Sequence, residues 1–282
     1  MTPARSLLAF ALALTACDPT DDEPDVDASA PRADAAAPSA DVYQPPPQVT
    51  WQWQLQGDRL GANYPVDLYD IDLFDQDASA IAGLQAAGHH VLCYFSAGSS
   101  ENWRPDFGRL PAATLGRPLD DWEGERWLDI RADAVWQVMA ERLDLAREKG
   151  CEGVEPDNVD AWDNDTGFPI TAADQLAFNR RLADGAHARG LAIALKNDGP
   201  QIPDLVAFFD LALNEQCHEM GDCEALRPFV TANKAALNVE YVDSAEQAAT
   251  LAETVCPASA ALGLRTLILP LELDDRFRVA CD

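Results

Sequence analysis

A short segment, residues 150–162, gathers side chains that are suited to acid–base chemistry. Its polar and aromatic members, which follow one strand-like run, are Glu155, Asp157, Asn158, Asp160 and Trp162. Residues two apart on a strand face the same side at ~3.3 Å rise per residue, so Glu155 and Asp157 can point into one cavity. Two such carboxylates repel, which raises the pKa of one and lowers that of the other. The pattern predicts paired proton-transfer chemistry, and its alternative is a solvated acidic loop.

These carboxylates need a scaffold, and the chain offers eight short apolar or alternating runs, most of them separated by helical patterns. The predicted strands are residues 51–56, 66–72, 90–98, 150–158, 191–198, 209–216, 236–242 and 266–272. Alternation of strands and helices indicates a parallel sheet, and this number of strands predicts an α/β fold, a (β/α)8 TIM-type barrel forming a single domain over residues 48–282. The alternative is a doubly wound open sheet, but no G-x-G-x-x-G or P-loop follows any of the runs.

Polar side chains stand at the ends of most predicted strands. They include Asp70, Asp72, Ser96, Ser99, Lys196, Asp198, Glu215, Glu240, Tyr241 and Glu272. Active sites of this barrel lie at the C-terminal ends of the strands, so these groups are expected to surround one cavity. The aromatic residues Trp53 and Tyr94 could supply flat faces for sugar rings, although packing in the core is an equally good explanation for each.

Composition restricts the class of partner. The 282 residues include 48% hydrophobic residues, enough for a large core, and carry a formal net charge of −28. Binding of nucleic acid requires clustered Lys and Arg, so the strongly negative net charge argues against nucleic acid as a ligand. An acidic surface favours a cationic ligand, and it is also a common aid to solubility.

The N-terminal region has the pattern of an export signal. Arg5 precedes the apolar run Leu7–Leu14, which is too short to span a bilayer, and Leu-Thr-Ala-Cys17 then resembles a bacterial lipobox. We predict a lipoprotein signal peptide over residues 1–16, acylation of Cys17, and anchoring to the cell envelope or cell surface by lipid alone. An ordinary cleaved signal peptide is the alternative. Residues 17–47, rich in Ala, Pro and Asp, are predicted to be a disordered acidic tether.

The remaining cysteines are even in number, as expected for disulfides in an exported protein. They are Cys93, Cys151, Cys217, Cys223, Cys256 and Cys281. Cys217 with Cys223 would close a small loop and Cys256 with Cys281 would staple the C-terminus, but six cysteines allow fifteen arrangements. A zinc site at Cys217, His218 and Cys223 is a weaker alternative, because a fourth ligand is missing.

Several blocks, in order along the chain, resemble glycoside hydrolase family 114. They are Trp51-Gln-Trp-Gln-Leu, Tyr69-Asp-Ile-Asp-Leu-Phe-Asp75, Cys93-Tyr-Phe-Ser-Ala-Gly-Ser99, Trp127-Leu-Asp-Ile-Arg131, Gly153-Val-Glu-Pro-Asp-Asn-Val-Asp160, Leu195-Lys-Asn-Asp198 and Leu213-Asn-Glu-Gln216. The resemblance implies a TIM-type barrel with endo-α-1,4-polygalactosaminidase activity on polymers of galactosamine and N-acetylgalactosamine. Such polymers are cationic where they are deacetylated, which fits the acidic composition.

The resemblance also implies which residues act. The two catalytic carboxylates fall on Asp157 and Glu215, to which we assign the roles of nucleophile and acid/base. We expect the following residues to bind sugar or tune this pair: Trp53, Asp70, Tyr94, Glu155, Asn158, Lys196, Asn197, Glu240 and Tyr241. We expect no cofactor, no metal ion and a monomeric protein.

Three other functions remain open at this point. The barrel could cleave another α-linked exopolysaccharide, or it could be a surface-tethered polysaccharide-binding lipoprotein without turnover. A metal-dependent deacetylase is the third, although the chain has four histidines and no H-x-x-x-H spacing.

Overall fold

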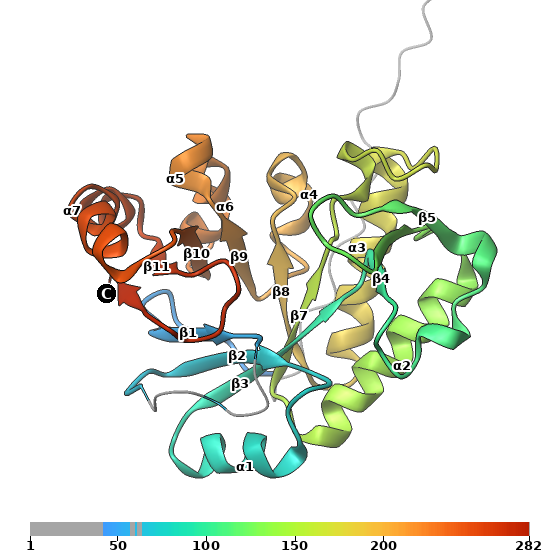
Figure 1. The fold of residues 1–282 in the computed structure, drawn as a ribbon, viewed down its shortest axis with the longest axis horizontal. Coiled ribbons are helices and arrows are strands. Elements are labelled where there is room, and N and C mark those ends of the chain that lie inside the picture. The colour runs from blue at the N-terminus through green and yellow to red at the C-terminus, as the bar shows by residue number, and fades with distance from the viewer. Residues whose placement is uncertain (1–41, 57–59, 61–63, 282) are drawn as a thin grey trace, which may run out of the picture. The chain divides into compact units, whose positions relative to one another are not determined.

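The computed structural model describes residues 42–56, 60 and 64–281. Eight parallel strands follow one another in chain order around a curled sheet (Figure 1). They are β1 Trp51–Gln54, β2 Leu68–Asp72, β3 His90–Ser96, β7 Gly153–Asp157, β8 Ala192–Lys196, β9 Leu211–Glu215, β10 Ala235–Tyr241 and β11 Arg265–Leu269. Each predicted run overlaps one of these strands, so the predicted (β/α)8 barrel topology is confirmed.

Helices connect the strands and cover their outer faces. They are α1 Ala78–Ala86, α2 Asp133–Lys149, α3 Ala172–His187, α4 Ile202–Leu205, α5 Cys217–Met220, α6 Arg227–Thr231 and α7 Ala245–Leu262. Short 3-10 turns are η1 Phe107–Arg109, η2 Ala112–Thr114, η3 Ala161–Asp163, η4 Gly199–Gln201 and η5 Cys223–Leu226. A capping box forms at the start of α3, where the Thr171 and Asp174 side chains each bond the other's backbone N–H.

Alternation along the strands produces two cores. One face of each strand points into the barrel, where the side chains that fill it include Trp51, Trp53, Leu68, Leu92, Leu213, Leu237, Val239 and Leu267. The other face packs on the helices, and its members include Tyr69, Ile71, Val91, Phe95, Val154 and Ile193. Each strand therefore sends every second residue inwards, and this period decides which polar side chains can reach the barrel mouth.

Side-chain and backbone hydrogen bonds close the barrel between its first and last parallel strands. Trp51 Nε1 donates a hydrogen bond of 2.9 Å to the carbonyl of Arg265, and Arg265 Nε donates one of 3.2 Å to the carbonyl of Val49. The backbone N–H of Leu55 donates to the carbonyl of Leu273 at 3.1 Å. A short strand, β12 (Val279–Ala280), pairs antiparallel with β11.

A second sheet is inserted between β3 and α2. Its strands β4 (Ser99–Glu101), β5 (Leu115–Pro118) and β6 (Glu125–Leu128) are antiparallel, in the order β4-β6-β5. We did not predict this sheet, because the strands are short and their spacing matches no helix or strand period. The connection is far longer than the ~2–6 residues usual between strand and helix, which is typical of a loop that carries function.

Three disulfides join Cys93 to Cys151, Cys217 to Cys223 and Cys256 to Cys281. The sequence favoured this arrangement without fixing it. The first disulfide ties β3 to the short turn between α2 and β7, so it links the strand that precedes the inserted sheet to the segment that leads into the strand that carries Asp157.

The folded part begins earlier than residue 48. Tyr43 stacks on His90 at 3.8 Å between ring centroids, and Gln44 Nε2 donates to Asp210 at 2.6 Å. The predicted tether over residues 17–47 therefore reaches into packed structure at its C-terminal end. The predicted signal peptide and Cys17 lie outside the described residues. Within the part of the chain that the structure describes, no helix has the length and apolar character needed to cross a bilayer.

Candidate active site

A cavity of about 780 Å³ opens at the C-terminal ends of the barrel strands. Its walls come from two sources, the barrel strands and the inserted sheet. The barrel contributes Trp53, Asp72, Tyr94, Asp157, Lys196, Glu215 and Tyr241, and the insertion contributes Glu101, Trp103, Arg104, Trp122, Glu125 and Trp127. Both predicted catalytic carboxylates, Asp157 and Glu215, therefore reach the same cavity at the mouth of the barrel.

Lys196, at the end of β8, lies at the centre of this site. Its Nζ is 3.0 Å from Asp157 Oδ1, 3.3 Å from Glu215 Oε2 and 3.1 Å from Glu155 Oε1. The indole ring of Trp53 lies 4.8 Å from the same nitrogen. Burial alone would lower the pKa of Lys196, but the surrounding carboxylates outweigh it and hold the pKa well above its usual value. Lys196 is therefore a fixed positive charge shared by the carboxylates.

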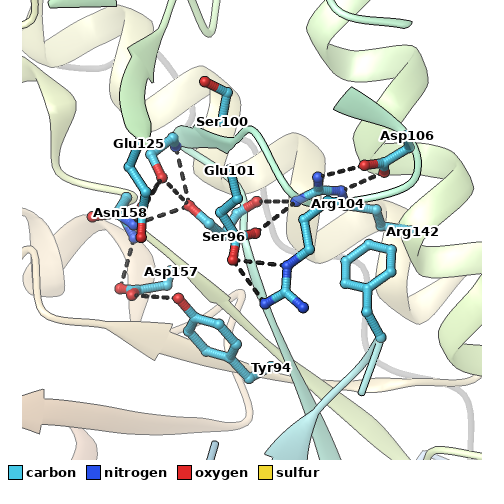
Figure 2. A network of polar contacts seen from close by, with 12 residues as sticks. Tyr94, Ser96, Ser100, Glu101, Arg104, Asp106, Glu125, Arg142, Asp157 and Asn158 are labelled. Atoms are coloured by element: carbon cyan, nitrogen blue, oxygen red, sulfur yellow. Dashed lines mark hydrogen bonds and ion pairs between the residues drawn. The ribbon is translucent and has the colours of Figure 1, made fainter. Parts of the chain in front are cut away.

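Hydrogen bonds fix the Asp157 carboxylate at the end of β7, where the backbone of the next residue, Asn158, packs closely against Gly98. Its Oδ1 accepts a hydrogen bond of 2.7 Å from the backbone N–H of Asn158, and its Oδ2 accepts one of 3.2 Å from the Tyr94 hydroxyl (Figure 2). Asn158 adopts a left-handed conformation with φ of 59°. A Cβ on Gly98 would lie 1.7 Å from the Asn158 carbonyl oxygen, so only glycine allows this approach.

Glu215, at the end of β9, is held on both oxygens. The Tyr241 hydroxyl donates to Oε1 at 2.5 Å, and Asn197 Nδ2 donates to Oε2 at 3.0 Å. The Asn197 side chain also accepts a hydrogen bond from the Glu215 backbone N–H at 3.0 Å. Burial would raise the pKa of Glu215, but Lys196 and these hydrogen bonds together hold the pKa below its usual value.

The shared lysine limits the separation of the two carboxylates. Because Asp157 Oδ1 and Glu215 Oε2 lie 3.0 and 3.3 Å from one nitrogen, these two oxygens are closer together than the ~6.5 Å at which inverting glycosidases begin. The shared lysine therefore holds the two carboxylates close to each other at the mouth of the barrel.

Asp70 and Glu155 lie one layer deeper than expected. Both side chains are buried and neither lines the cavity, while Glu155 Oε1 lies 3.1 Å from Lys196 Nζ. Burial raises the pKa of Asp70 to about 8, despite the opposing effect of Lys196, and raises that of Glu155 well above its usual value. Of the two expected roles, these positions fit tuning of the predicted catalytic pair and not contact with sugar.

Glu240 occupies a different place from the one expected. On β10 it alternates with Val239 and Tyr241, which face the barrel interior, so its side chain points outwards. Its carboxylate accepts hydrogen bonds from the backbone N–H groups of His218 and Glu219 at 2.9 and 3.3 Å. We therefore withdraw Glu240 as a sugar ligand, because it anchors the start of α5 instead.

The inserted sheet brings site residues that the sequence did not reveal. Glu101 and Glu125 line the cavity, and Arg104 donates to Glu101 and to Asp72. Two tryptophans at the rim remain unusually exposed, Trp103 at 54% and Trp122 at 47%. The available signal was the length of the segment between β3 and α2 together with its three tryptophans, Trp103, Trp122 and Trp127.

The zinc alternative finds no support at Cys217, His218 and Cys223. The two sulfurs form a disulfide with each other, so neither is a thiolate ligand. His218 Nε2 is hydrogen-bonded to Ser259 Oγ at 2.7 Å.

A parallel eight-stranded barrel with an acidic cavity at the C-terminal ends of its strands is an architecture of sugar-cleaving hydrolases. The chain belongs to glycoside hydrolase family GH114, whose model matches residues 31–282. This confirms the family and the class of enzyme, a glycoside hydrolase, that the sequence blocks indicated.

The chain is also similar to three individual proteins. It is 39% identical to Aspergillus fumigatus Ega3, solved in complex with galactosamine, with a TM-score of 0.81 over 88% of this chain and 99% of that one. The glycoside hydrolase domain of Pseudomonas aeruginosa PelA shares the fold, at 13% identity and a TM-score of 0.64 over 82% of this chain and 98% of that domain. An uncharacterised Deinococcus radiodurans protein is 29% identical over 213 residues, 68% of this chain and 67% of that protein.

Proposed function

We propose that this protein hydrolyses α-1,4-linked polymers of galactosamine and N-acetylgalactosamine with retention of anomeric configuration. The observation that carries the proposal is the pair of cavity carboxylates, Asp157 and Glu215, held by one buried ammonium group at 3.0 and 3.3 Å. Retaining enzymes need carboxyl groups ~5–5.5 Å apart, and the shared lysine favours this spacing over the wider one.

In the first step, Glu215 donates its proton to the glycosidic oxygen, the bond from that oxygen to the anomeric carbon breaks, and Asp157 forms an ester with that carbon. Asp157 thereby loses its negative charge, and Lys196 keeps the charged Glu215 as its neighbour in the cavity. This favours the ionised form of Glu215, which then takes a proton from water as the water attacks the ester. The sugar leaves with its original configuration, and both carboxyl groups return to their starting state.

Three features support an amino-sugar polymer as the substrate. The chain carries a net charge of −28, which attracts polymers whose deacetylated units are cationic. The similar Ega3 structure contains galactosamine. The exposed rim residues Trp103 and Trp122 offer flat faces on which successive sugar rings can stack.

The decisive experiment is hydrolysis of a deacetylated galactosamine polymer by the purified protein. Mass spectrometry of the products reports their size, and NMR of the first-formed anomer reports the stereochemistry. We expect oligosaccharides that first appear as the α-anomer. A protein that binds the polymer and releases no more sugar than its Asp157→Asn and Glu215→Gln variants would instead be a polysaccharide-binding lipoprotein. Release of sugar from a different α-linked polymer alone would change the substrate and keep the chemistry.

We further propose that the protein is exported and lipid-anchored through Cys17. The lipobox-like Leu-Thr-Ala-Cys17 supports this, as do three disulfides, which are typical of exported proteins. Fractionation of producing cells should recover the wild-type protein with membranes and the Cys17→Ser variant without them. Recovery of both proteins in the same soluble fraction would contradict lipid anchoring.

A further inference from the structure

The inserted sheet places two glutamates directly opposite each other. Glu101 on β4 and Glu125 on β6 are register partners of the antiparallel pair, so their side chains share one face. Both are buried, with exposed fractions of 2% and 7%, and both line the active-site cavity. Like charges in this position are destabilising unless cations compensate them.

Among the described residues, arginine side chains lie close to the carboxylate of Glu101 but not to that of Glu125. Arg104 Nε donates to Glu101 Oε1 at 2.8 Å, and Arg142 Nη1 lies 3.8 Å from Glu101 Oε2. Glu125 Oε2 accepts a hydrogen bond of 2.6 Å from Ser99 Oγ. Within residues 42–56, 60 and 64–281, no lysine or arginine nitrogen comes within 4.0 Å of the Glu125 carboxylate. Figure 2 shows the two arginines gathered beside Glu101 and away from Glu125.

The surroundings of Glu125 disfavour its charge. Burial raises the pKa of Glu125 to about 7, and the nearby carboxylates of Glu101 and Asp157 add to the effect, while Ser99 and Arg104 oppose it. A buried carboxyl group that faces a cavity, and whose cation is missing, is a common mark of a binding site. The missing cation would have to enter through the cavity.

We propose that Glu125 binds the ammonium group of a 2-amino-2-deoxy sugar and thereby makes the enzyme prefer the free amine to the acetamide. This inference rests on the proposed amino-sugar substrate and adds the residue that recognises it. An ammonium group has three N–H donors, and an acetamide has one donor and no charge. Glu101 Oε2, which is buried without a hydrogen bond, offers the same ligand a second acceptor. Charge complementarity in this water-poor wall therefore favours the amine.

The test compares binding of galactosamine and galactose, which differ in the amine, by calorimetry at neutral pH. We expect wild-type protein to prefer galactosamine, and the Glu125→Gln variant to lose most of that preference, at least tenfold, while binding galactose as before. The Glu125→Asp variant, which keeps the carboxylate, should retain a preference. Because these sugars are not hydrolysed, the outcome is independent of catalysis.

A matched control is Glu123→Gln, the same change two residues away on an exposed position outside the cavity. It should keep the wild-type preference. Melting temperatures establish that each variant is folded, and Glu125→Gln should be at least as stable as wild type because it removes an uncompensated buried charge. A folded Glu125→Gln variant with undiminished preference overturns the assignment and leaves the proposed hydrolase intact. A wild-type protein without any preference overturns the assignment and the amino-sugar substrate together.

Discussion

The Tyr241 hydroxyl donates a hydrogen bond of 2.5 Å to Oε1 of Glu215. Tyr241 reaches this position because it faces the barrel interior at the end of β10, beside the strand that ends in Glu215. The hydrogen bond favours the ionised carboxylate, so it helps to hold the pKa of the proposed acid/base below its usual value, against the effect of burial. A general acid with a low pKa is protonated only in acid, and we therefore expect hydrolysis to be fastest at acidic pH.

The Tyr241→Phe variant tests this relationship. Loss of the hydrogen bond removes a contribution that lowers the pKa of Glu215, so the protonated form persists to higher pH and the basic limb of the kcat/KM profile should move upwards. Tyr94→Phe is the matched control, because its hydroxyl contacts Asp157 and not Glu215. A basic limb that moves equally in both variants would show that Tyr241 does not act through Glu215.

Variants that lack one or the other carboxylate should both lose activity, but they should form different products with azide. Asp157→Ala and Glu215→Ala should each lower kcat by roughly 10³-fold or more, because each removes a group that we propose takes part in bond cleavage. Sodium azide should then act as a replacement nucleophile. In the Asp157 variant it should give the β-glycosyl azide, and in the Glu215 variant the α-glycosyl azide, as NMR would show. The reverse pattern would exchange the two roles.

Lys196 should be essential to the stability of the site. Lys196→Met leaves buried carboxylates without their cation, which costs about 3–5 kcal/mol of unfolding free energy. The pKa of Glu215 lies below its ordinary 4.5 in the fold, so its stabilising contribution is present above that pH and lost below it. The cost should therefore shrink in acid. Lys234→Met, which removes an ammonium group bonded to the carbonyls of Val206 and Phe209, should show no such pH dependence in denaturant titrations.

Gly98 should tolerate no side chain. In Gly98→Ala the new Cβ would overlap the Asn158 carbonyl, so the backbone beside Asp157 must shift. We expect a loss of about 1–3 kcal/mol in stability and at least a tenfold lower kcat, because small displacements of reacting groups are costly. Gly83→Ala is the control, since nothing lies within 4 Å of its added Cβ. Wild-type kcat in Gly98→Ala would contradict the tight approach.

The disulfides should contribute unequally. Cys93 and Cys151 are 58 residues apart, and Cys217 and Cys223 are 6 apart. Because a longer closed loop restricts the unfolded chain more, replacing the first pair with serine should cost about 4 kcal/mol and replacing the second about 2 kcal/mol. Chemical denaturation of the two double variants measures the difference. Equal costs would mean that the native structure, and not loop length, sets the contribution.

The barrel could be predicted because its signals are local. Each apolar run and the polar residues at its end lie within a few positions of one another, and so Asp157, Glu215 and Lys196 were correctly expected at one mouth of the barrel. The depth of a side chain in the barrel and the direction in which it points were harder to predict. Glu155 shares a face with Asp157, as the period of two requires, but it lies one layer lower. Glu240 lies one position out of phase with Tyr241 and points away. The pairing of Glu101 with Glu125 depends on a register between two short strands, which no local pattern specifies.

The insertion of the β4–β6 sheet has an evolutionary consequence. Sugar cleavage is assigned to side chains on the barrel strands, whereas Glu125 belongs to an appendage that leaves the ladder between β3 and β7 unbroken. Mutations within residues 99–128 can therefore diversify substrate choice in descendants without disturbing the bond-breaking apparatus. Chimaeras that exchange this segment between homologues should inherit the selectivity of the donor and the turnover chemistry of the recipient.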